Sequence, residues 1–229
     1  MSTINHYNML MANSCLMTVL RPLAHTIYRA LFPSRIQGIE NYSALPTNQP
    51  LIITCNHIGH HDPVLLVARF NRNLHFLAKS ELLDGHFGWF FRHLGLVRVD
   101  RNKTGSGLAE ARKYLEDNKV IVIFPEGTTK FKDMQELLPF KHGAVKLAIE
   151  TGAPILPVAI MGRPRPLWFG RCRIQVGHSY HPDGATDVDS ATHYLEQLTL
   201  QLMRQAGATH PKLLPGKPAR NPSKERPVV

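Results

Sequence analysis

The sequence is poor in acidic residues, in cysteines and in long apolar runs. Among its 229 residues, 17 are Asp or Glu and 27 are Lys or Arg, so the formal net charge is +10. This excess of positive charge favours an anionic partner, which can be nucleic acid, the anionic surface of a membrane or a phosphorylated small molecule. Charge alone does not choose among these three classes.

The three cysteines, Cys15, Cys55 and Cys172, lie far apart and without CxxC spacing. This argues against a disulfide framework and a cysteine zinc site, and favours a reducing, cytoplasmic setting. No uncharged apolar run reaches the roughly 18 residues of a membrane-spanning helix, and the N-terminus lacks the pattern of a signal peptide. We therefore expect peripheral contact with the cytoplasmic face of a membrane.

The remaining composition is that of an ordinary globular protein, with 43% hydrophobic and 19% charged residues. A length of 229 residues suits one domain with a sizeable core. We predict three segments: an N-terminal helical membrane-interface segment at 1–34, a main domain at 35–208 and a disordered, basic, proline-rich tail at 209–229. The tail is either a solvated end or an electrostatic tether to anionic lipid.

The N-terminal segment has apolar residues at helical spacing from Leu16 to Leu31, interleaved with Arg21, His25 and Arg29. This pattern predicts an amphipathic helix that Pro22 kinks or restarts. Two readings remain open. The helix packs on the main domain, or it lies in the lipid interface with its apolar stripe buried.

The main domain alternates short apolar runs with helical patterns. The runs expected to be strands are Leu51–Cys55, Leu74–Ala78, Leu96–Val99, Val120–Phe124, Ile155–Ile160 and Arg173–Val176. Helices are expected at Gly107–Asn118, at Ala144–Glu150 with Gly152 as the stop, and from Val188 to about Gln205. This alternation predicts an α/β fold, a single domain with a mixed, largely parallel sheet flanked by helices.

Polar motifs follow these strands directly. Asn56-His57 follows the first strand, Lys79 the second, Asp100-Arg101 the third and Pro125-Glu126-Gly127-Thr128 the fourth. Ligands of open α/β sheets bind beyond the carboxyl ends of the strands. We therefore expect one crevice that combines a histidine, carboxylates and cations, which suits acid/base chemistry on an anionic substrate.

His57 and Asp62 are the candidate catalytic pair. A histidine can accept a proton near neutral pH, and a carboxylate on its other ring nitrogen fixes the tautomer. Gly59 permits the turn that folds Asp62 back onto His57. The alternative is that Asp62 caps a helix beginning at Pro63. Because both residues fall in a predicted loop, their replacement should reduce turnover more than stability.

Two further histidines, His60 and His61, raise the alternative of a metal-dependent hydrolase that uses them together with His57 and Asp62. Their spacing matches no strong metal motif. The simpler reading gives them loop positions that contact solvent or substrate.

Ordered sequence blocks make the pattern specific. Asn56-His57, four residues and Asp62 resemble the NHxxxxD signature of the glycerolipid acyltransferase family, which includes 1-acyl-glycerol-3-phosphate acyltransferases. Four later blocks keep the family's order: Ala78–Leu82 resembles AKxEL, Gly95–Arg101 its second block, Phe124–Thr128 FPEGT and Phe140–Gly143 FKxG. Ile155–Ala159 resembles the closing hydrophobic-proline block, so the resemblance spans roughly residues 35–160.

This resemblance implies an enzyme that moves a fatty acyl group from an acyl thioester to the hydroxyl of 1-acyl-glycerol-3-phosphate, giving phosphatidic acid in phospholipid biosynthesis. His57 would deprotonate the hydroxyl with support from Asp62. Neither cofactor nor metal is implied, and acyl-CoA or an acyl carrier protein thioester is the co-substrate. The expected partners are a phospholipid membrane surface, the lysophospholipid acceptor and the acyl donor, without nucleic acid.

The resemblance also implies a set of substrate-binding residues. Lys79 and Arg101 would bind the acceptor phosphate, while Glu126, Gly127 and Thr128 would orient the glycerol portion. The alternatives are that Glu126 caps a helix and that the two cations are solvated surface charges.

One position departs from the family pattern. The third block usually continues EGTRS, but this chain has Thr129-Lys130 after Thr128. Lys130 offers a cation one position later, without the planar fork of arginine. The acceptor therefore remains open among lysophosphatidic acid, glycerol 3-phosphate, another lysolipid and a compound without phosphate. A non-enzymatic binder of anionic membranes or nucleic acid, driven by the basic tail, is the remaining alternative.

Overall fold

The computed structural model describes residues 26, 28–79, 96–99, 106–129, 134–162, 172–182, 184 and 187–215, with backbone only at 78, 79, 96–99 and 106. Most of the predicted N-terminal segment therefore lies outside the described residues. Its described end contains a helical turn at 28–31, directly before the first strand.

A seven-stranded sheet forms the centre of the described part of the chain, in the order β1-β8-β7-β2-β5-β3-β4. Its strands are β1 Ser34–Gln37, β2 Leu51–Cys55, β3 Leu74–Lys79, β4 Leu96–Val99, β5 Val120–Ile123, β7 Ile155–Met161 and β8 Cys172–Val176. β7 and β8 are antiparallel, and the other neighbouring pairs are parallel. The predicted mixed, largely parallel sheet is thus confirmed.

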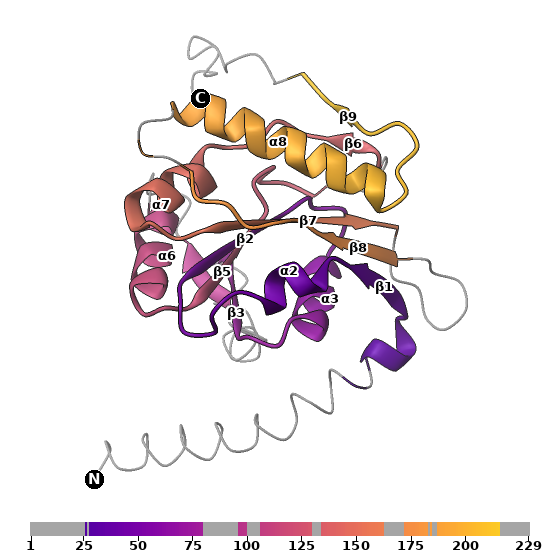
Figure 1. Ribbon diagram of the computed structural model, residues 1–229, viewed down its shortest axis with the longest axis horizontal. Coiled ribbons are helices and arrows are strands. Elements are labelled where there is room, and N and C mark those ends of the chain that lie inside the picture. The colour runs from indigo at the N-terminus through magenta and orange to yellow at the C-terminus, as the bar shows by residue number, and fades with distance from the viewer. Residues whose placement is uncertain are drawn as a thin grey trace, which may run out of the picture.

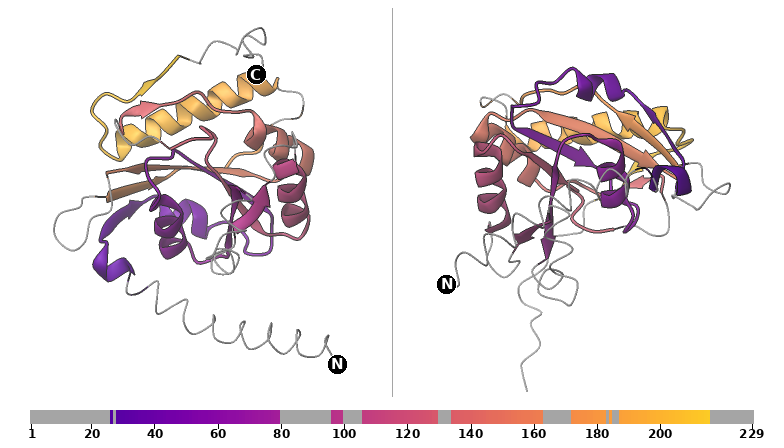
Figure 2. Two further views of the ribbon diagram at one scale, coloured as in Figure 1. Left: turned by 180° about the vertical axis from the view of Figure 1, so that it is seen from behind. Right: turned by 90° about the horizontal axis from the view of Figure 1, so that it is seen from below.

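Helices cover both faces of this sheet (Figure 1). They are α2 Ile39–Ser43, α3 Asp62–Arg69, α6 Ser106–Glu116, α7 Gly143–Thr151 and α8 Val188–Gln205. Successive residues of a strand point to opposite faces, so Ile52 joins a buried cluster with α6, α7 and α8, whereas Leu51 and Ile53 join one with α2 and α3. The result is a layer of helices on each side of the sheet, seen from behind and from below in Figure 2.

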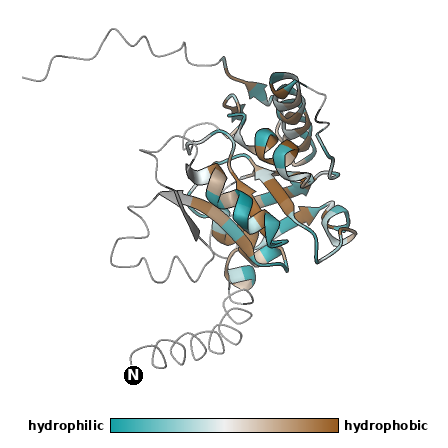
Figure 3. Ribbon diagram, turned by 90° about the vertical axis from the view of Figure 1, so that its left-hand side faces the viewer, coloured by the Kyte–Doolittle hydropathy of each residue, from teal (hydrophilic) through white to brown (hydrophobic). Residues whose placement is uncertain are grey.

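The middle strands are buried along their whole length. All five residues of β2 and all seven of β7 are buried, because both strands have neighbours on either side and helices on both faces. Figure 3 shows these strands in brown among helices that carry hydrophilic residues on their outer sides. This burial explains why the sequence predicted β2 and β7 with end errors of no more than one residue. The partly exposed edge strand β1 was not predicted.

Local signals fix the ends of several helices. Pro63 lies in the first turn of α3, where its missing N–H costs no hydrogen bond. α7 ends at Gly152, which adopts φ +68°, as the glycine stop predicted. Before α8, the side chain of Asp187 accepts a hydrogen bond from the amide of Ser190 at 3.1 Å.

The predicted tail boundary at residue 209 is wrong. Two short strands, β6 Glu136–Leu137 and β9 Lys212–Leu213, pair in parallel. The amide of Leu214 donates to the carbonyl oxygen of Leu137 at 2.8 Å, and Leu213 packs against the cluster that includes Leu137. Apolar residues inside a basic, proline-rich stretch thus extend the fold to residue 215, and residues 216–229 lie outside the description.

Within the described ranges, no helix combines the length and the apolar character that a membrane crossing needs.

Candidate active site

The register between β2 and β5 brings two sequence motifs together. These strands are parallel neighbours, and Thr54 lies opposite Ile123. His57 and Glu126 are each three residues further along, so they lie at the same edge of the sheet. There the amide of His57 donates to Oε1 of Glu126 at 2.9 Å, across 69 residues of sequence.

His57 and Asp62 form a hydrogen-bonded pair. Nδ1 of His57 lies 2.8 Å from Oδ2 of Asp62. The same oxygen accepts the amides of Ile58 at 2.8 Å and Gly59 at 2.9 Å. An ionised carboxylate only accepts hydrogen bonds, so Nδ1 carries the proton and Nε2 presents its lone pair. This arrangement holds a histidine ready to accept a proton at Nε2.

The alternative role of Asp62 as a helix cap is wrong. Asp62 is the first residue of α3, and His61 occupies the cap position without a side-chain bond. The amides that Asp62 accepts belong to Ile58 and Gly59, which precede the helix. Asp62 is also fully buried, so it lies in the core of the site and not in an exposed loop.

An aromatic ring fixes the plane of the imidazole. The ring of Phe124, which follows β5, lies 4.1 Å from that of His57 with an interplanar angle of 20°. The side chain of His57 is 17% exposed. Stacking on one side and the Asp62 bond on the other restrict ring rotation, while a small part of the side chain stays open to a substrate.

Asn56 anchors the residue before the histidine. Its side-chain amide donates to the carbonyl oxygen of Ile160 at 2.9 Å and accepts the amide of Ile160 at 2.8 Å. Through these two bonds, the side chain of Asn56 continues the hydrogen bonding between β2 and β7 past the end of β2. Because Asn56 is fully buried, the backbone that carries His57 cannot shift easily.

Glu126 joins three segments around the pair. Oε2 accepts the amide of Leu138 at 2.8 Å, in addition to the His57 bond through Oε1, and the side chain is 5% exposed. Neither amide begins a helix, so the helix-cap alternative for Glu126 is wrong. The turn that carries Glu126 closes with a 3.0 Å bond from the amide of Gly127 to the carbonyl oxygen of Phe124. Gly127 has φ +68°, which favours glycine.

The histidines after His57 point to no metal centre. His60 and His61 are exposed, and no three His, Cys, Asp or Glu side chains among the described residues come together as possible metal ligands. Cys55 adds no nucleophile, because burial raises the pKa of its thiol well above the usual value. The geometry thus favours histidine acid/base chemistry.

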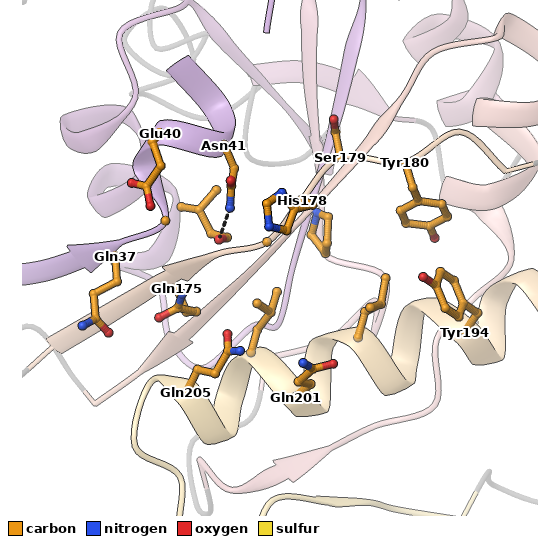
Figure 4. A pocket seen from close by; sticks show the side chains of 16 residues that line it. Gln37, Glu40, Asn41, Gln175, His178, Ser179, Tyr180, Tyr194, Gln201 and Gln205 are labelled. Carbon is orange, nitrogen blue, oxygen red and sulfur yellow. Dashed lines mark hydrogen bonds between the residues drawn. The ribbon is translucent and has the colours of Figure 1, made fainter. Parts of the chain in front are cut away.

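A separate pocket of about 970 Å³ lies between α2, the end of β8 and α8. Figure 4 shows polar side chains in its lining, with Asn41 donating a hydrogen bond to the carbonyl oxygen of Val176 and with Tyr180 beside Tyr194. Its wall includes Pro157 and Gly177 but neither His57 nor Glu126. We therefore locate the active site by the His57–Asp62 pair.

Comparison with known proteins agrees with this geometry. The family described as Acyltransferase matches residues 35–161, more than half of the chain, from the second residue of β1 to the end of β7. The chain belongs to the acyltransferase family. The matched region of this acyltransferase contains His57, Asp62 and Glu126.

Relatives of this acyltransferase include the 1-acyl-sn-glycerol-3-phosphate acyltransferase of Bacillus subtilis, 32% identical over 54% of this chain and 62% of the relative. The human 1-acyl-sn-glycerol-3-phosphate acyltransferase alpha is 27% identical over 76% of this chain and 64% of its own length. The chain therefore spans less than two thirds of these relatives.

The fold has a solved counterpart. The crystal structure of the 1-acyl-sn-glycerophosphate (LPA) acyltransferase of Thermotoga maritima superposes with a TM-score of 0.68 at 24% identity, covering 88% of this chain and 84% of that one. At this identity the likeness establishes the fold. It extends the match well beyond residue 161, in keeping with β8 and α8 belonging to the same sheet and core.

The structure brings together part of the predicted set of site residues. His57, Asp62 and Glu126 are in contact, and Gly127 and exposed Thr128 continue the Glu126 turn. Lys79 ends β3, the neighbour of β5, so its backbone lies at the same edge of the sheet. The side chain of Lys79 and the whole of Arg101 and Lys130 lie outside the description.

Sequence reasoning missed the residues that hold this acyltransferase site in place. Phe124 and Asn56 stood in the quoted blocks without a role. Glu196 of α8 gave a signal, because an acidic residue occupied the apolar side of a predicted helix. It is 6% exposed, and its Oε1 accepts the amide of Phe140 at 2.7 Å.

Proposed function

We propose that this chain transfers a fatty acyl group from an acyl thioester to the hydroxyl of 1-acyl-glycerol-3-phosphate, yielding phosphatidic acid. The observation that carries the proposal is the 2.8 Å contact between His57 Nδ1 and Asp62 Oδ2. It leaves Nε2 of a partly open histidine as the base. Family membership and the names of the relatives supply the reaction class and the acceptor.

In the proposed reaction, Nε2 of His57 removes the proton of the acceptor hydroxyl as its oxygen attacks the thioester carbonyl carbon. A C–O bond forms and the C–S bond breaks. The proton then passes from Nε2 to the leaving sulfur, which departs as the free thiol. Asp62 stabilises the transient imidazolium. General base catalysis by the pair as a whole contributes a rate factor of about 10²–10⁴.

The direct test is acyl transfer by purified protein reconstituted with phospholipid vesicles. Labelled acyl-CoA and acyl carrier protein thioesters are each supplied with lysophosphatidic acid, and phosphatidic acid is measured by chromatography. We expect product with at least one donor and a loss of about 10²–10⁴-fold in His57→Ala. If no glycerolipid acceptor is acylated while a known acyltransferase works in the same assay, the proposal is wrong.

The acceptor is the less constrained part of the proposal, because Thr129 and Lys130 follow Thr128 where the family usually has arginine and serine. A panel of lysophosphatidic acid, glycerol 3-phosphate, lysophosphatidylcholine and monoacylglycerol measures the preference directly. We expect lysophosphatidic acid to have the highest kcat/KM. A higher value for monoacylglycerol would assign a non-phosphate acceptor.

We also propose that the chain works on a phospholipid membrane surface, because its acceptor and product are lipids. The apolar stripe with basic neighbours in residues 16–31 supports this proposal. Removing residues 1–32 should reduce co-sedimentation with anionic vesicles, and removing residues 216–229 measures any contribution of the tail. Unchanged co-sedimentation after both deletions would place membrane contact elsewhere on the domain.

A further inference from the structure

Lys141 lies against the turn that carries Glu126. A Cβ atom built on Gly127 would lie 2.7 Å from both Cε and Nζ of Lys141 and 3.2 Å from its Cδ. The lysine side chain thus occupies the space beside the Cα of Gly127, which only a glycine leaves open. The ammonium group therefore lies beside the turn whose Glu126 bonds the amide of His57.

The backbone beneath this side chain is held from two directions. The amide of Lys141 donates to the carbonyl oxygen of Pro125 at 2.9 Å. The preceding amide, that of Phe140, donates at 2.7 Å to Glu196, a buried carboxylate of α8. Lys141 therefore starts from a fixed Cα position, and only its side chain has to order when a ligand binds.

Lys141 is also an available charge. Its side chain is exposed, and it forms no ion pair with any carboxylate in the described ranges of the chain. Both oxygens of nearby Glu126 already accept backbone amides. Lys141 lies just before His142, the N-cap residue of α7, so the positive end of that helix dipole adds to the same local field. The combination favours an anion beside Gly127.

We propose that Lys141 binds the phosphate of the acceptor, beside a turn in which Thr129 offers no cation. This inference rests on the proposed function, because it concerns the acceptor of that same reaction. A lysine ammonium contacts phosphate as a point charge, whereas arginine grips it with two parallel bonds. Lys141 is therefore a specificity residue that distinguishes phosphorylated acceptors from neutral ones.

The experiment compares Lys141→Met, Lys141→Arg and the wild type. Methionine keeps an unbranched chain against Gly127 but removes the charge, and arginine restores it. Lys146→Met is the matched control, since Lys146 is an exposed lysine five residues further along, within α7. KM and kcat are measured with lysophosphatidic acid and with monoacylglycerol. Equilibrium binding of labelled lysophosphatidic acid in mixed micelles is measured without acyl donor, together with the melting temperature.

We expect Lys141→Met to raise KM and Kd for lysophosphatidic acid about 10–100-fold. Values for monoacylglycerol, the melting temperature and all Lys146→Met values should stay unchanged, and Lys141→Arg should recover most of the affinity. Unchanged lysophosphatidic acid affinity in Lys141→Met would overturn the inference. An equal loss with both acceptors and a lower melting temperature would also overturn it, because Lys141 would then only support the turn.

The binding measurement separates this inference from the proposed function. If the wild type binds lysophosphatidic acid in a Lys141-dependent way but transfers no acyl group, the phosphate site stands and the proposed function fails. If the wild type transfers acyl groups and Lys141→Met binds the acceptor normally, the proposed function stands and the phosphate site at Lys141 fails. Absence of both binding and transfer would overturn both.

Discussion

At the scale of single residues, Asp62 shows how one carboxylate serves both fold and chemistry. Its Oδ2 accepts hydrogen bonds from two amides and from Nδ1 of His57, whereas the buried Oδ1 has no hydrogen-bond partner among the described residues. An asparagine can therefore place its carbonyl oxygen in the Oδ2 position and its NH₂ group in the Oδ1 position. Shape and the hydrogen bonds to Oδ2 survive this exchange and the negative charge does not, while an unpartnered NH₂ group replaces an unpartnered carboxylate oxygen.

We accordingly predict different outcomes for two substitutions of Asp62. Asp62→Asn should lower kcat by about 10²–10⁴-fold while the melting temperature changes little. Asp62→Ala should lower both, because each unpaired buried donor costs about 1–3 kcal/mol. Steady-state kinetics and thermal unfolding of the two proteins check this. Equal destabilisation by both would show that the charge itself holds the fold.

Each carboxylate oxygen of Glu126 accepts one backbone amide. Its glutamine variant should therefore behave differently from Asp62→Asn. In Glu126→Gln, one of the two oxygens becomes an NH₂ group that faces either the His57 or the Leu138 amide. We expect a loss of about 1–3 kcal/mol in unfolding free energy and reduced turnover. Glu116→Gln, at an exposed position of α6, is the control and should leave both unchanged. A stable, fully active Glu126→Gln would contradict the dual role.

At the scale of elements, β9 supports the site from a distance. It pairs with β6, and the residue after β6, Leu138, donates its amide to Glu126. The C-terminal strand is thus linked to His57 through a short series of hydrogen bonds. A segment whose composition suggested a tail instead holds part of the active-site frame.

Two truncations test this role of β9. Removing residues 212–229 deletes the bonds of Lys212 and Leu214 and the packing of Leu213. We expect the melting temperature to fall by roughly 4–8 °C, from about 2 kcal/mol of lost interactions, with lower acyl transfer. Removing residues 216–229 only is the control and should leave the melting temperature unchanged. Equal stability of both truncated proteins would show that β9 contributes nothing.

At the scale of the whole molecule, buried thiols make stability depend on alkaline pH. Burial raises the pKa of Cys172 to about 12, and its thiol therefore stays protonated in the folded chain. In the unfolded chain a thiol ionises near pH 8.5. The unfolded state thus releases its proton first, and stability falls as pH rises from about 8.5 toward 12.

Thermal unfolding between pH 7 and pH 10.5 checks this dependence. The wild type should lose stability progressively above about pH 8.5, whereas Cys172→Ala should show a smaller loss relative to its own value at pH 7. Alkylation should modify Cys172 only after unfolding. Parallel pH profiles for both proteins would mean that other groups, such as Tyr28 with its pKa raised to about 12 by burial, dominate.

The sequence determined much of this protein by local means. The period of apolar residues identified β2 and β4 to the residue and α8 from Val188. The five-residue spacing of His57 and Asp62 is short enough for a single turn to close, so their pairing needed no distant contact. The order of the blocks identified the family, because it depends on the chain alone.

Only the tertiary structure decided how distant segments meet. The order of the strands places β5 between β2 and β3, so Glu126 contacts the backbone of His57 and its carboxylate holds the frame of the site. The same packing brings Lys141 onto Gly127 and β9 onto β6. These contacts join residues far apart in the chain, and their free energy depends on the whole core, which no local pattern encodes.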